Sequence, residues 1–273
     1  MTGSGTLRFM DRIAAVMRGH GMHPITRAAR NLMDKVNTKG ISIVADELWI
    51  SGSLKDRAFL YSVEEGRFEP STIQRFKEVV MPGMVVLDAG AYLGYYSVLA
   101  SRLVGPRGKI FSFEPNPGSY HFLGRNVAAN HCANVITYKL AVSSQCRDER
   151  LYLNSEDVTR TSLFLRSGAG KSIRIESTTV DEVVGSFRVD IAKIDVEGAE
   201  LLVLEGMKNT IEKNPDIILF MELNPVSLRE AGTSPVQLME KLYEYGFTHI
   251  TRLDEEPDGN GEDRYCNLFC SRQ

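Results

Sequence analysis

Residues 85–97 read Val-Val-Leu-Asp-Ala-Gly-Ala-Tyr-Leu-Gly-Tyr-Tyr-Ser, a buried strand pattern that runs into a glycine turn and then opens a helix. In an open α/β sheet, ligands bind beyond the carboxyl end of such a strand, where a turn without side chains lets them approach the backbone. Gly90 and Gly94 provide this turn. Two glycines alone are also compatible with a tight packing turn, so the neighbouring carboxylates carry the argument for a nucleotide-type ligand.

The spacing of the glycines indicates which ligand fits. A dinucleotide fingerprint would read Gly-x-Gly-x-x-Gly, because a pyrophosphate needs close contact with the backbone and with a helix start. Here Tyr92 occupies the middle glycine position, and the motif from Asp88 reads Asp-x-Gly-x-x-x-Gly. This spacing suits a ligand with an amino-acid tail and no pyrophosphate, which points to S-adenosylmethionine. Glu114 ends the next predicted strand, 24 residues after Gly90, where a carboxylate can accept both ribose hydroxyls.

Two further predicted strands end in acidic residues. Asp195 ends one of them, and Glu222, followed by Asn224, ends the next. Such a pair can orient a hydroxyl and accept its proton, or it can hold a divalent cation that lowers the hydroxyl pKa. Asp195, Glu222 and Asn224 offer the hard oxygen ligands that Mg²⁺ prefers, and the sequence does not choose between the two uses. Glu197 and Glu200 fall in the following turn, and an acid at a helix start explains Glu200.

Other side chains could contribute to the site. Aromatic residues could supply stacking faces for a sugar, although such residues pack cores just as often; they are Tyr92, Tyr95, Tyr96 and Trp49. Residues 160–163 (Arg-Thr-Ser-Leu) could add hydrogen-bond donors. Three histidines are alternative bases that we expect to lie away from the strand ends: His121, His131 and His249.

Apolar runs of strand length alternate with helical patterns from residue 84 onward. The predicted strands are 85–88, 109–114, 135–140, 191–195 and 217–222, and the predicted helices are 94–104, 118–130, 199–213 and 235–245. Short apolar strands separated by helices indicate a doubly wound α/β fold, with a mostly parallel, Rossmann-like sheet covered on both faces. Strands predicted at 151–154 and 173–177 form an insertion between the third and fourth core strands, and this insertion could roof the site.

The N-terminal part has a different pattern. Residues 8–18 and 25–36 carry apolar residues at helical spacing, and residues 41–51 predict a strand or short hairpin. A basic amphipathic helix can lie on a membrane surface, but packing on the main domain or on a dimer partner is commoner. We therefore divide the chain into a helical and β extension, residues 1–75, which offers a homodimer contact, and a main domain, residues 76–273.

Composition excludes several classes of protein. The 273 residues include 32 Lys and Arg and 35 Asp and Glu, a net charge of −3 that argues against a nucleic-acid partner. The apolar run 217–221 is far shorter than the roughly 20 residues of a membrane span, and no secretory segment is visible, so we expect a cytoplasmic protein. Four cysteines are too few for a disulfide scaffold, and Cys266 and Cys270 are predicted to be reduced and packed in a strand.

Residues about 60–250 resemble the FkbM family of S-adenosylmethionine-dependent methyltransferases. The segments that carry the resemblance, in the family's order, are Glu69-Pro70, residues 88–97, 113–116 (Phe-Glu-Pro-Asn), 141–143 (Ala-Val-Ser), 178–181 (Thr-Thr-Val-Asp) and 193–200 (Lys-Ile-Asp-Val-Glu-Gly-Ala-Glu). The resemblance implies a class I methyltransferase fold and usually O-methylation. Sugar hydroxyls of glycoconjugates are the expected acceptors, and hydroxyls of polyketide natural products are the alternative.

The resemblance also implies roles for individual residues. It places Asp88, Gly90, Tyr92 and Ser97 around the methionine moiety, Glu114 at the ribose, and Asn116 with Ala141, Val142 and Ser143 beside the adenine. Glu69 and Gly94 are assigned to the same cofactor site, and Asp195 is expected beside the transferred methyl. In the reaction that follows, an acceptor hydroxyl attacks the methyl in line, and Asp195 or Glu222 removes the proton.

Three rival functions are weaker. A nicotinamide-dependent oxidoreductase would need the phosphate-binding glycines that Tyr92 replaces. A non-catalytic scaffold that keeps a cofactor-binding fold would not need Asp195 and Glu222. A nucleic-acid methyltransferase would usually show an Asn/Asp-Pro-Pro-aromatic run or a basic face, and residues 222–225 (Glu-Leu-Asn-Pro) are not such a run.

Overall fold

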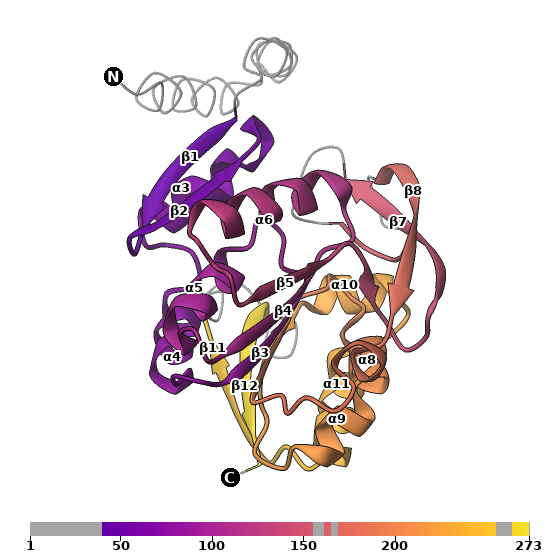
Figure 1. Cartoon of the computed structure of the whole chain (residues 1–273). Coiled ribbons are helices and arrows are strands. Elements are labelled where there is room, and N and C mark those ends of the chain that lie inside the picture. Colours follow the sequence, from indigo (N-terminus) through magenta and orange to yellow (C-terminus); the bar gives the residue numbers. More distant parts are fainter. Residues whose placement is uncertain (1–39, 155–160, 165–168, 255–263, 273) are drawn as a thin grey trace.

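The computed structural model describes residues 40–154, 161–164, 169–254 and 264–272 (Figure 1). Its centre is a seven-stranded sheet with the order β11-β12-β10-β9-β3-β4-β5. The strands are β3 (Val85–Ala89), β4 (Lys109–Phe113), β5 (Val135–Tyr138), β9 (Ile191–Ile194), β10 (Ile218–Leu223), β11 (His249–Leu253) and β12 (Cys266–Ser271). The five strands from β10 to β5 run parallel, and β12 is antiparallel to both its neighbours. The predicted doubly wound, mostly parallel sheet is confirmed.

The order of the strands creates a crevice at one edge of the sheet. The chain moves outward from β3 to β4 and β5, and then returns to the other side of β3 to form β9 and β10. Connections therefore leave the carboxyl ends of β3 and β9 in opposite directions. In doubly wound sheets, ligands bind at this reversal of strand order.

Helices cover both faces of the sheet. They are α3 (Arg57–Glu64), α4 (Pro70–Val79), α5 (Tyr95–Val104), α6 (Pro117–Ala129), α7 (Val180–Val184), α8 (Glu200–Gly206), α9 (Lys208–Lys213), α10 (Pro225–Glu230) and α11 (Pro235–Glu244). Figure 1 shows α4 and α5 on one side of the sheet and α8, α9 and α11 on the other. Successive strand residues point to opposite faces, so Val86 packs in one hydrophobic cluster with α5 while Leu87 packs in the other with α8.

The four helices predicted between residues 94 and 245 agree with the observed ones, with one difference. The helix expected over 199–213 is two helices, α8 and α9, which meet at Met207. Met207 has φ −119°, outside the α-helical range, and its side chain is fully buried in the core. The helix is therefore interrupted at Met207, where the side chain packs into the core. The apolar periodicity of the sequence continues through this position and does not reveal the interruption.

The segment before the main sheet forms a hairpin, as residues 41–51 predict. Strands β1 (Ile41–Ala45) and β2 (Leu48–Gly52) pair antiparallel and are followed by the short 3₁₀ helix η1 (Leu54–Asp56). Asn126 of α6 ties the hairpin to the main domain, because its side chain accepts from Ser51 N–H at 2.9 Å and donates to Leu93 O at 2.7 Å. The helices predicted at 8–18 and 25–36, with their dimer contact, lie outside the described residues, and the division at residue 75 stays a prediction.

The predicted insertion between the third and fourth core strands is a small separate sheet. It contains β6 (Ala141–Val142), β7 (Arg147–Asn154) and β8 (Ala169–Thr178), in the order β6-β8-β7. Ser162 forms a bridge with Tyr152, and its hydroxyl donates to the carbonyl of Glu197 at 2.7 Å. The insertion is thereby attached to the loop after β9, where it can cover the strand ends.

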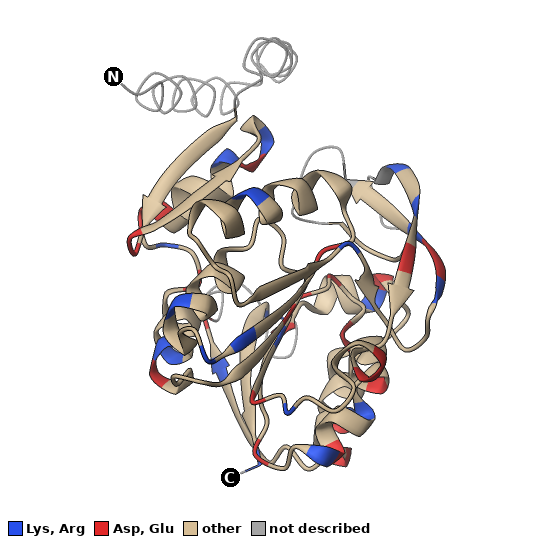
Figure 2. Ribbon diagram, viewed as in Figure 1, with Lys and Arg blue, Asp and Glu red and all other residues tan. Residues whose placement is uncertain are grey.

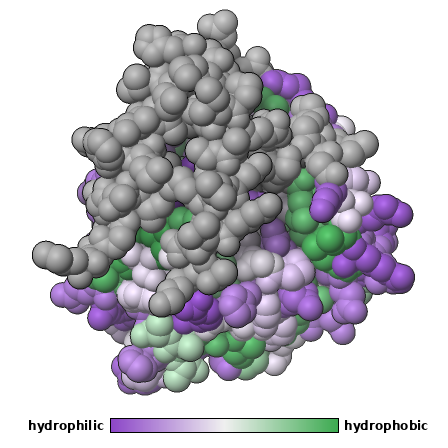
Figure 3. Space-filling model, turned by 90° about the horizontal axis from the view of Figure 1, so that it is seen from above, coloured by the Kyte–Doolittle hydropathy of each residue, from purple (hydrophilic) through white to green (hydrophobic). Residues whose placement is uncertain are grey.

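Charged and hydrophobic residues of the described ranges are distributed over the faces drawn in Figures 2 and 3 without one dominant patch. Lys and Arg are interspersed with Asp and Glu over the face drawn in Figure 2, and hydrophobic residues form several separate groups on the described surface in Figure 3. Cys266 and Cys270 are buried free thiols in β12, as predicted. Within the described part of the chain, no helix combines the length and apolarity needed to cross a bilayer.

Candidate active site

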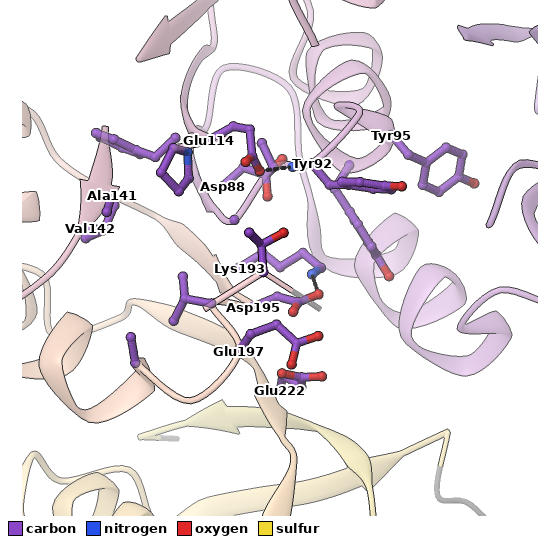
Figure 4. A pocket seen from close by; sticks show the side chains of 18 of the residues that line it. Asp88, Tyr92, Tyr95, Glu114, Ala141, Val142, Lys193, Asp195, Glu197 and Glu222 are labelled. Atoms are coloured by element: carbon purple, nitrogen blue, oxygen red, sulfur yellow. Dashed lines mark hydrogen bonds and ion pairs between the residues drawn. The ribbon is translucent and has the colours of Figure 1, made fainter. Parts of the chain in front are cut away.

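A pocket lies at the carboxyl ends of β3, β4, β9 and β10 (Figure 4). The predicted site residues that line it are Glu69, Asp88, Gly90, Tyr92, Glu114, Ala141, Val142, Asp195 and Glu222. In Figure 4, Ala141 and Val142 lie at one end and Tyr95 at the other, with the acidic side chains between them. The fold thus brings together residues that are up to 153 positions apart in the sequence.

The glycine turn lets two loops approach each other. Gly90 has φ +85°, and a Cβ at this position would lie 1.7 Å from the carbonyl oxygen of Asp195. Gly94 has φ +86° and ends the turn at the start of α5. Tyr92 has φ +51°, so the residue that replaces the middle glycine still adopts the left-handed conformation. Its backbone N–H donates to Glu114, and its hydroxyl donates to the carboxylate of Asp56.

Glu114 is held rigidly at the pocket wall. Its two carboxylate oxygens accept backbone N–H bonds, one from Tyr92 and one from Asn116, each at 2.8 Å. A carboxylate oxygen can accept two hydrogen bonds, so each oxygen keeps a position for a ligand hydroxyl. Burial raises the pKa of Glu114 to about 7, although the two N–H bonds lower it.

Asp88 and Ser97 form a buried pair beneath the turn. The Ser97 hydroxyl donates to Asp88 Oδ2 at 2.5 Å and receives a bond from Ser112 at 2.8 Å. Ser97 is fully buried and does not line the pocket, so it supports Asp88 from behind. Burial raises the pKa of Asp88, and Lys193 and Ser97 act in the opposite direction.

Lys193 lines the pocket, and sequence reasoning gave it no role. Its ammonium donates to Asp195 Oδ2 at 2.8 Å and lies 4.7 Å from the ring centre of Tyr96. The hydroxyl of Tyr96 in turn donates to Glu69 at 2.6 Å. Burial lowers the pKa of Lys193, but Asp195, Glu69 and Asp88 together raise it above its ordinary value. Lys193 is the charged centre around which the acids of the pocket are arranged.

Glu222 has an unusual environment at the floor of the pocket. Its side chain is 4% exposed, and its Oε2 has no hydrogen-bond partner. Burial, with the charges of Glu197 and Asp195, raises its pKa well above the ordinary value. Glu197 lines the same pocket, and its carboxylate accepts from the Ser227 hydroxyl at 3.0 Å.

Several predicted site residues do not line the pocket. They are Gly94, Ser97, Asn116, Ser143 and Asn224. Asn116 caps α6 by accepting from Gly118 N–H at 2.9 Å, and Asn224 caps α10 by accepting from Ser227 N–H at 3.2 Å. Asn224, which the magnesium prediction requires, does not line the pocket, and the described residues contain no group of three or more His, Cys, Asp or Glu placed to hold a metal. The structure gives the magnesium prediction no support.

Aromatic residues surround the end of the pocket opposite Ala141. Tyr92, Tyr95 and Tyr96 line it as the sequence suggests, whereas Trp49 and the three histidines do not. Of the insertion residues, Thr161 and Leu163 line the pocket, and residue 160 lies outside the described residues. The structure adds three aromatic residues that the sequence did not single out: Phe59, Phe68 and Tyr265.

Comparison with known proteins agrees with this geometry. Residues 88–248, more than half of the chain, match the family described as the methyltransferase FkbM domain. The chain is 27% identical over 203 residues to the hexuronic acid methyltransferase AglP of Haloferax volcanii, a match that covers 73% of this chain and 78% of that protein. It is 28% identical over 155 residues to the methyltransferase sdnD of Sordaria araneosa, which covers 45% of this chain and 60% of that protein.

Solved structures with related folds are more distant. A precorrin-6y C5,15-methyltransferase from Geobacter metallireducens gives a TM-score of 0.45 at 13% identity, covering 73% of this chain and 87% of that one. An S-adenosylmethionine-dependent O-methyltransferase from Thermotoga maritima gives 0.46 at 13% identity, covering 85% of this chain and 77% of that one.

The sheet order, the glycine turn and the strand-end acids define a class I S-adenosylmethionine-dependent methyltransferase. The chain belongs to the FkbM methyltransferase family.

Proposed function

We propose that this protein transfers a methyl group from S-adenosylmethionine to a hydroxyl of a sugar or glycoconjugate. The observation that carries the proposal is the pocket at the reversal of strand order, where Glu114 and Asp195 face the same space. The family match supports methyl transfer, and the relative named as a hexuronic acid methyltransferase supports a saccharide acceptor.

The pocket residues fit S-adenosylmethionine. Glu114 has one open position on each oxygen for the two ribose hydroxyls, because its other positions accept N–H bonds. Phe113, Leu140 and Val142 supply apolar surface for the adenine at the adjacent end. When bound, the cofactor supplies an electrophilic methyl group on a sulfonium. The carboxylate of Asp195 complements that positive charge.

The acceptor hydroxyl needs alignment and a proton acceptor. Holding two reactants in the attack geometry contributes roughly 7–11 kcal/mol in well-oriented systems, so positioning accounts for much of the rate. Lys193 fixes the Asp195 carboxylate at the pocket wall. The Asp195 side chain is 26% exposed there and can accept the hydroxyl proton. Glu222, which also lines the pocket, can hold the same hydroxyl from the other side.

The first test separates cofactor binding from catalysis. Calorimetry should show S-adenosylhomocysteine binding to the purified full chain, and Glu114→Gln should weaken it about 10- to 150-fold, because a hydrogen bond to a charged group contributes about 1.5–3 kcal/mol. Asp195→Asn should bind S-adenosylhomocysteine more nearly as the wild type does. With tritiated S-adenosylmethionine and a panel of glycosides, it should transfer label at least tenfold more slowly.

Two results would contradict the proposal. Absence of S-adenosylhomocysteine binding to the wild-type chain would remove the methyl-donor site. Wild-type turnover by Asp195→Asn would remove that carboxylate from the chemistry and leave Glu222 as the candidate base.

A further inference from the structure

Residues 40–68 precede the region that matches the FkbM domain, yet two of their aromatic side chains line the pocket. Asp56 of the same segment does not line it, but its carboxylate accepts a hydrogen bond from the hydroxyl of Tyr92, which does. We infer that Asp56 is a positioning residue for the cofactor: it holds Tyr92 in the conformation that keeps Glu114 aimed at the ribose hydroxyls. The inference rests on the proposed function and deepens it.

Tyr92 connects the N-terminal segment to the cofactor carboxylate. Its φ of +51° lies in the left-handed region, which is unfavourable for a residue with a Cβ, so surrounding contacts must maintain it. Its backbone N–H donates to Glu114 Oε2 at 2.8 Å (Figure 4). Its side chain is held by Asp56 and by the ring of Phe59, 5.1 Å away edge to face. Without the bond to Asp56, Tyr92 can leave this conformation, and its N–H then turns away from Glu114.

Asp56 is itself fixed before it meets Tyr92. Its side chain is buried, at 6% exposure, and its Oδ2 accepts from both the backbone N–H and the hydroxyl of Ser53, each at 2.6 Å. Oδ1 accepts from Tyr92. Hydrogen bonds to a carboxylate are stronger than those between neutral groups. The orientation of the acceptor oxygen is therefore set by its own loop, and Tyr92 conforms to it.

The backbone around this hydrogen bond is closely fitted. A Cβ on Gly52, at the end of β2, would lie 2.9 Å from Asp56 Cβ and 2.8 Å from Leu93 Cδ1, so the glycine allows the two segments to approach. The carbonyl of Leu93 accepts from Asn126 at 2.7 Å, and the same side chain holds β2. Two successive residues of the turn, Tyr92 and Leu93, are thus attached to the N-terminal segment.

The test uses Tyr92→Phe, which removes only the hydroxyl. Calorimetry on the full chain should show S-adenosylhomocysteine binding roughly 2- to 30-fold more weakly than to the wild type. An analogue of S-adenosylhomocysteine that lacks both ribose hydroxyls should bind the two proteins equally, because the effect passes through Glu114. The matched control is Tyr120→Phe on α6, whose hydroxyl donates to the carbonyl of Thr137 at 3.3 Å and which should leave both affinities unchanged.

A second set of variants separates this role from a role in folding. Asp56→Ala should lose affinity for S-adenosylhomocysteine as Tyr92→Phe does, and the double variant should bind no more weakly than Asp56→Ala, because both changes remove one hydrogen bond. Ser53→Ala removes a contact to Asp56 but keeps the bond to Tyr92. It should therefore bind S-adenosylhomocysteine as the wild type does, even where its melting temperature falls. If Asp56→Ala does not fold, the Tyr92→Phe comparison decides alone.

Three results would overturn the inference while leaving the methyl-donor site intact. They are unchanged binding of S-adenosylhomocysteine by Tyr92→Phe, an equal loss of affinity for both ligands in that variant, and losses that add in the double variant. Equal affinity of the wild type for the two ligands would also overturn it, because Glu114 would then not hold the ribose. If the wild-type chain binds neither ligand, the proposed function fails and the inference fails with it.

Discussion

Replacing Lys193 with methionine tests the arrangement of the pocket most directly. Methionine has a similar length and no charge, so the change removes the ammonium and leaves the buried acids in place. The Lys193 ammonium nitrogen and Asp195 Oδ2 are 2.8 Å apart. At an effective dielectric constant near 20, opposite charges at this distance attract by about 6 kcal/mol. Removing the ammonium also removes the cost of taking it out of water, which offsets part of the lost attraction. The net cost of removing one partner of a buried pair is typically about 3–5 kcal/mol.

We therefore expect Lys193→Met to lower the free energy of unfolding by about 3–5 kcal/mol, or the melting temperature by roughly 6–20 °C. Urea titration and calorimetry measure the two quantities. The matched control is Lys208→Met on α9, whose partner Glu212 lies 3.9 Å away and is 60% exposed. An exposed pair of this kind contributes about 0–1 kcal/mol.

A double variant separates charge from packing. Lys193→Met combined with Glu69→Gln removes one of the acids that the ammonium compensates, while the new amide oxygen can still accept from Tyr96. The double variant should therefore be more stable than the sum of the single losses predicts, by about 1–3 kcal/mol. A Lys193→Met protein as stable as Lys208→Met, or strictly additive losses, would refute the view that Lys193 compensates the pocket acids.

The remaining predictions concern pH and backbone geometry. Burial raises the pKa of Glu200 to about 7, so between pH 4.5 and 7 the folded chain holds a proton that the unfolded chain releases, and this contribution to stability falls as pH rises. Glu200→Gln should therefore gain stability over the wild type between pH 5 and pH 8, by up to about 3 kcal/mol in urea titrations; a Glu200→Gln curve parallel to the wild-type curve would contradict this. Gly90→Ala should lose several kcal/mol and bind no S-adenosylhomocysteine, because its Cβ would meet the Asp195 carbonyl at 1.7 Å. Gly232→Ala, at φ +77° in open space, should lose only about 1–2 kcal/mol, and equal losses at the two glycines would refute the steric argument.

The sequence was sufficient for the five parallel strands of the sheet and for their strand-end acids. Apolar runs locate the strands because buried parallel strands need apolar residues on both faces. The carboxyl ends of parallel strands share one edge, so Asp88, Asp195 and Glu222 had to lie near one another once the strand order was that of a doubly wound sheet. Gly90 and Gly94 marked the turn because few residues other than glycine adopt a positive φ without cost.

Side chains with two possible uses were harder to assign. Asn116 and Asn224 follow strands and precede helices, where an amide can face a ligand or cap the helix, and both cap. Ser97 lies beneath the turn and supports Asp88. Residues that reach the pocket from distant segments, such as Phe68 and Tyr265, leave no mark in local spacing.

Lys193 had a signal that can be read in retrospect. It is the charged residue in the otherwise apolar strand β9, two positions before Asp195, and residues two apart on a strand share a face. A lysine inside such a strand needs acids around it. Its register opposite Asp88 on β3 supplies one of them.

The position of β12 has a consequence for how the protein is made. This strand lies between β10 and β11, and its Asn267 is the register partner of Glu222. Of the described residues that line the pocket, all but Tyr265 have been synthesised once the ribosome reaches residue 222. Strand β10 nevertheless lacks its neighbour β12 until the ribosome has passed residue 271. During that interval β10 has an unpaired edge beside a buried acid. A nascent chain is therefore expected to acquire its ligand-binding form late and in one step, when β12 inserts.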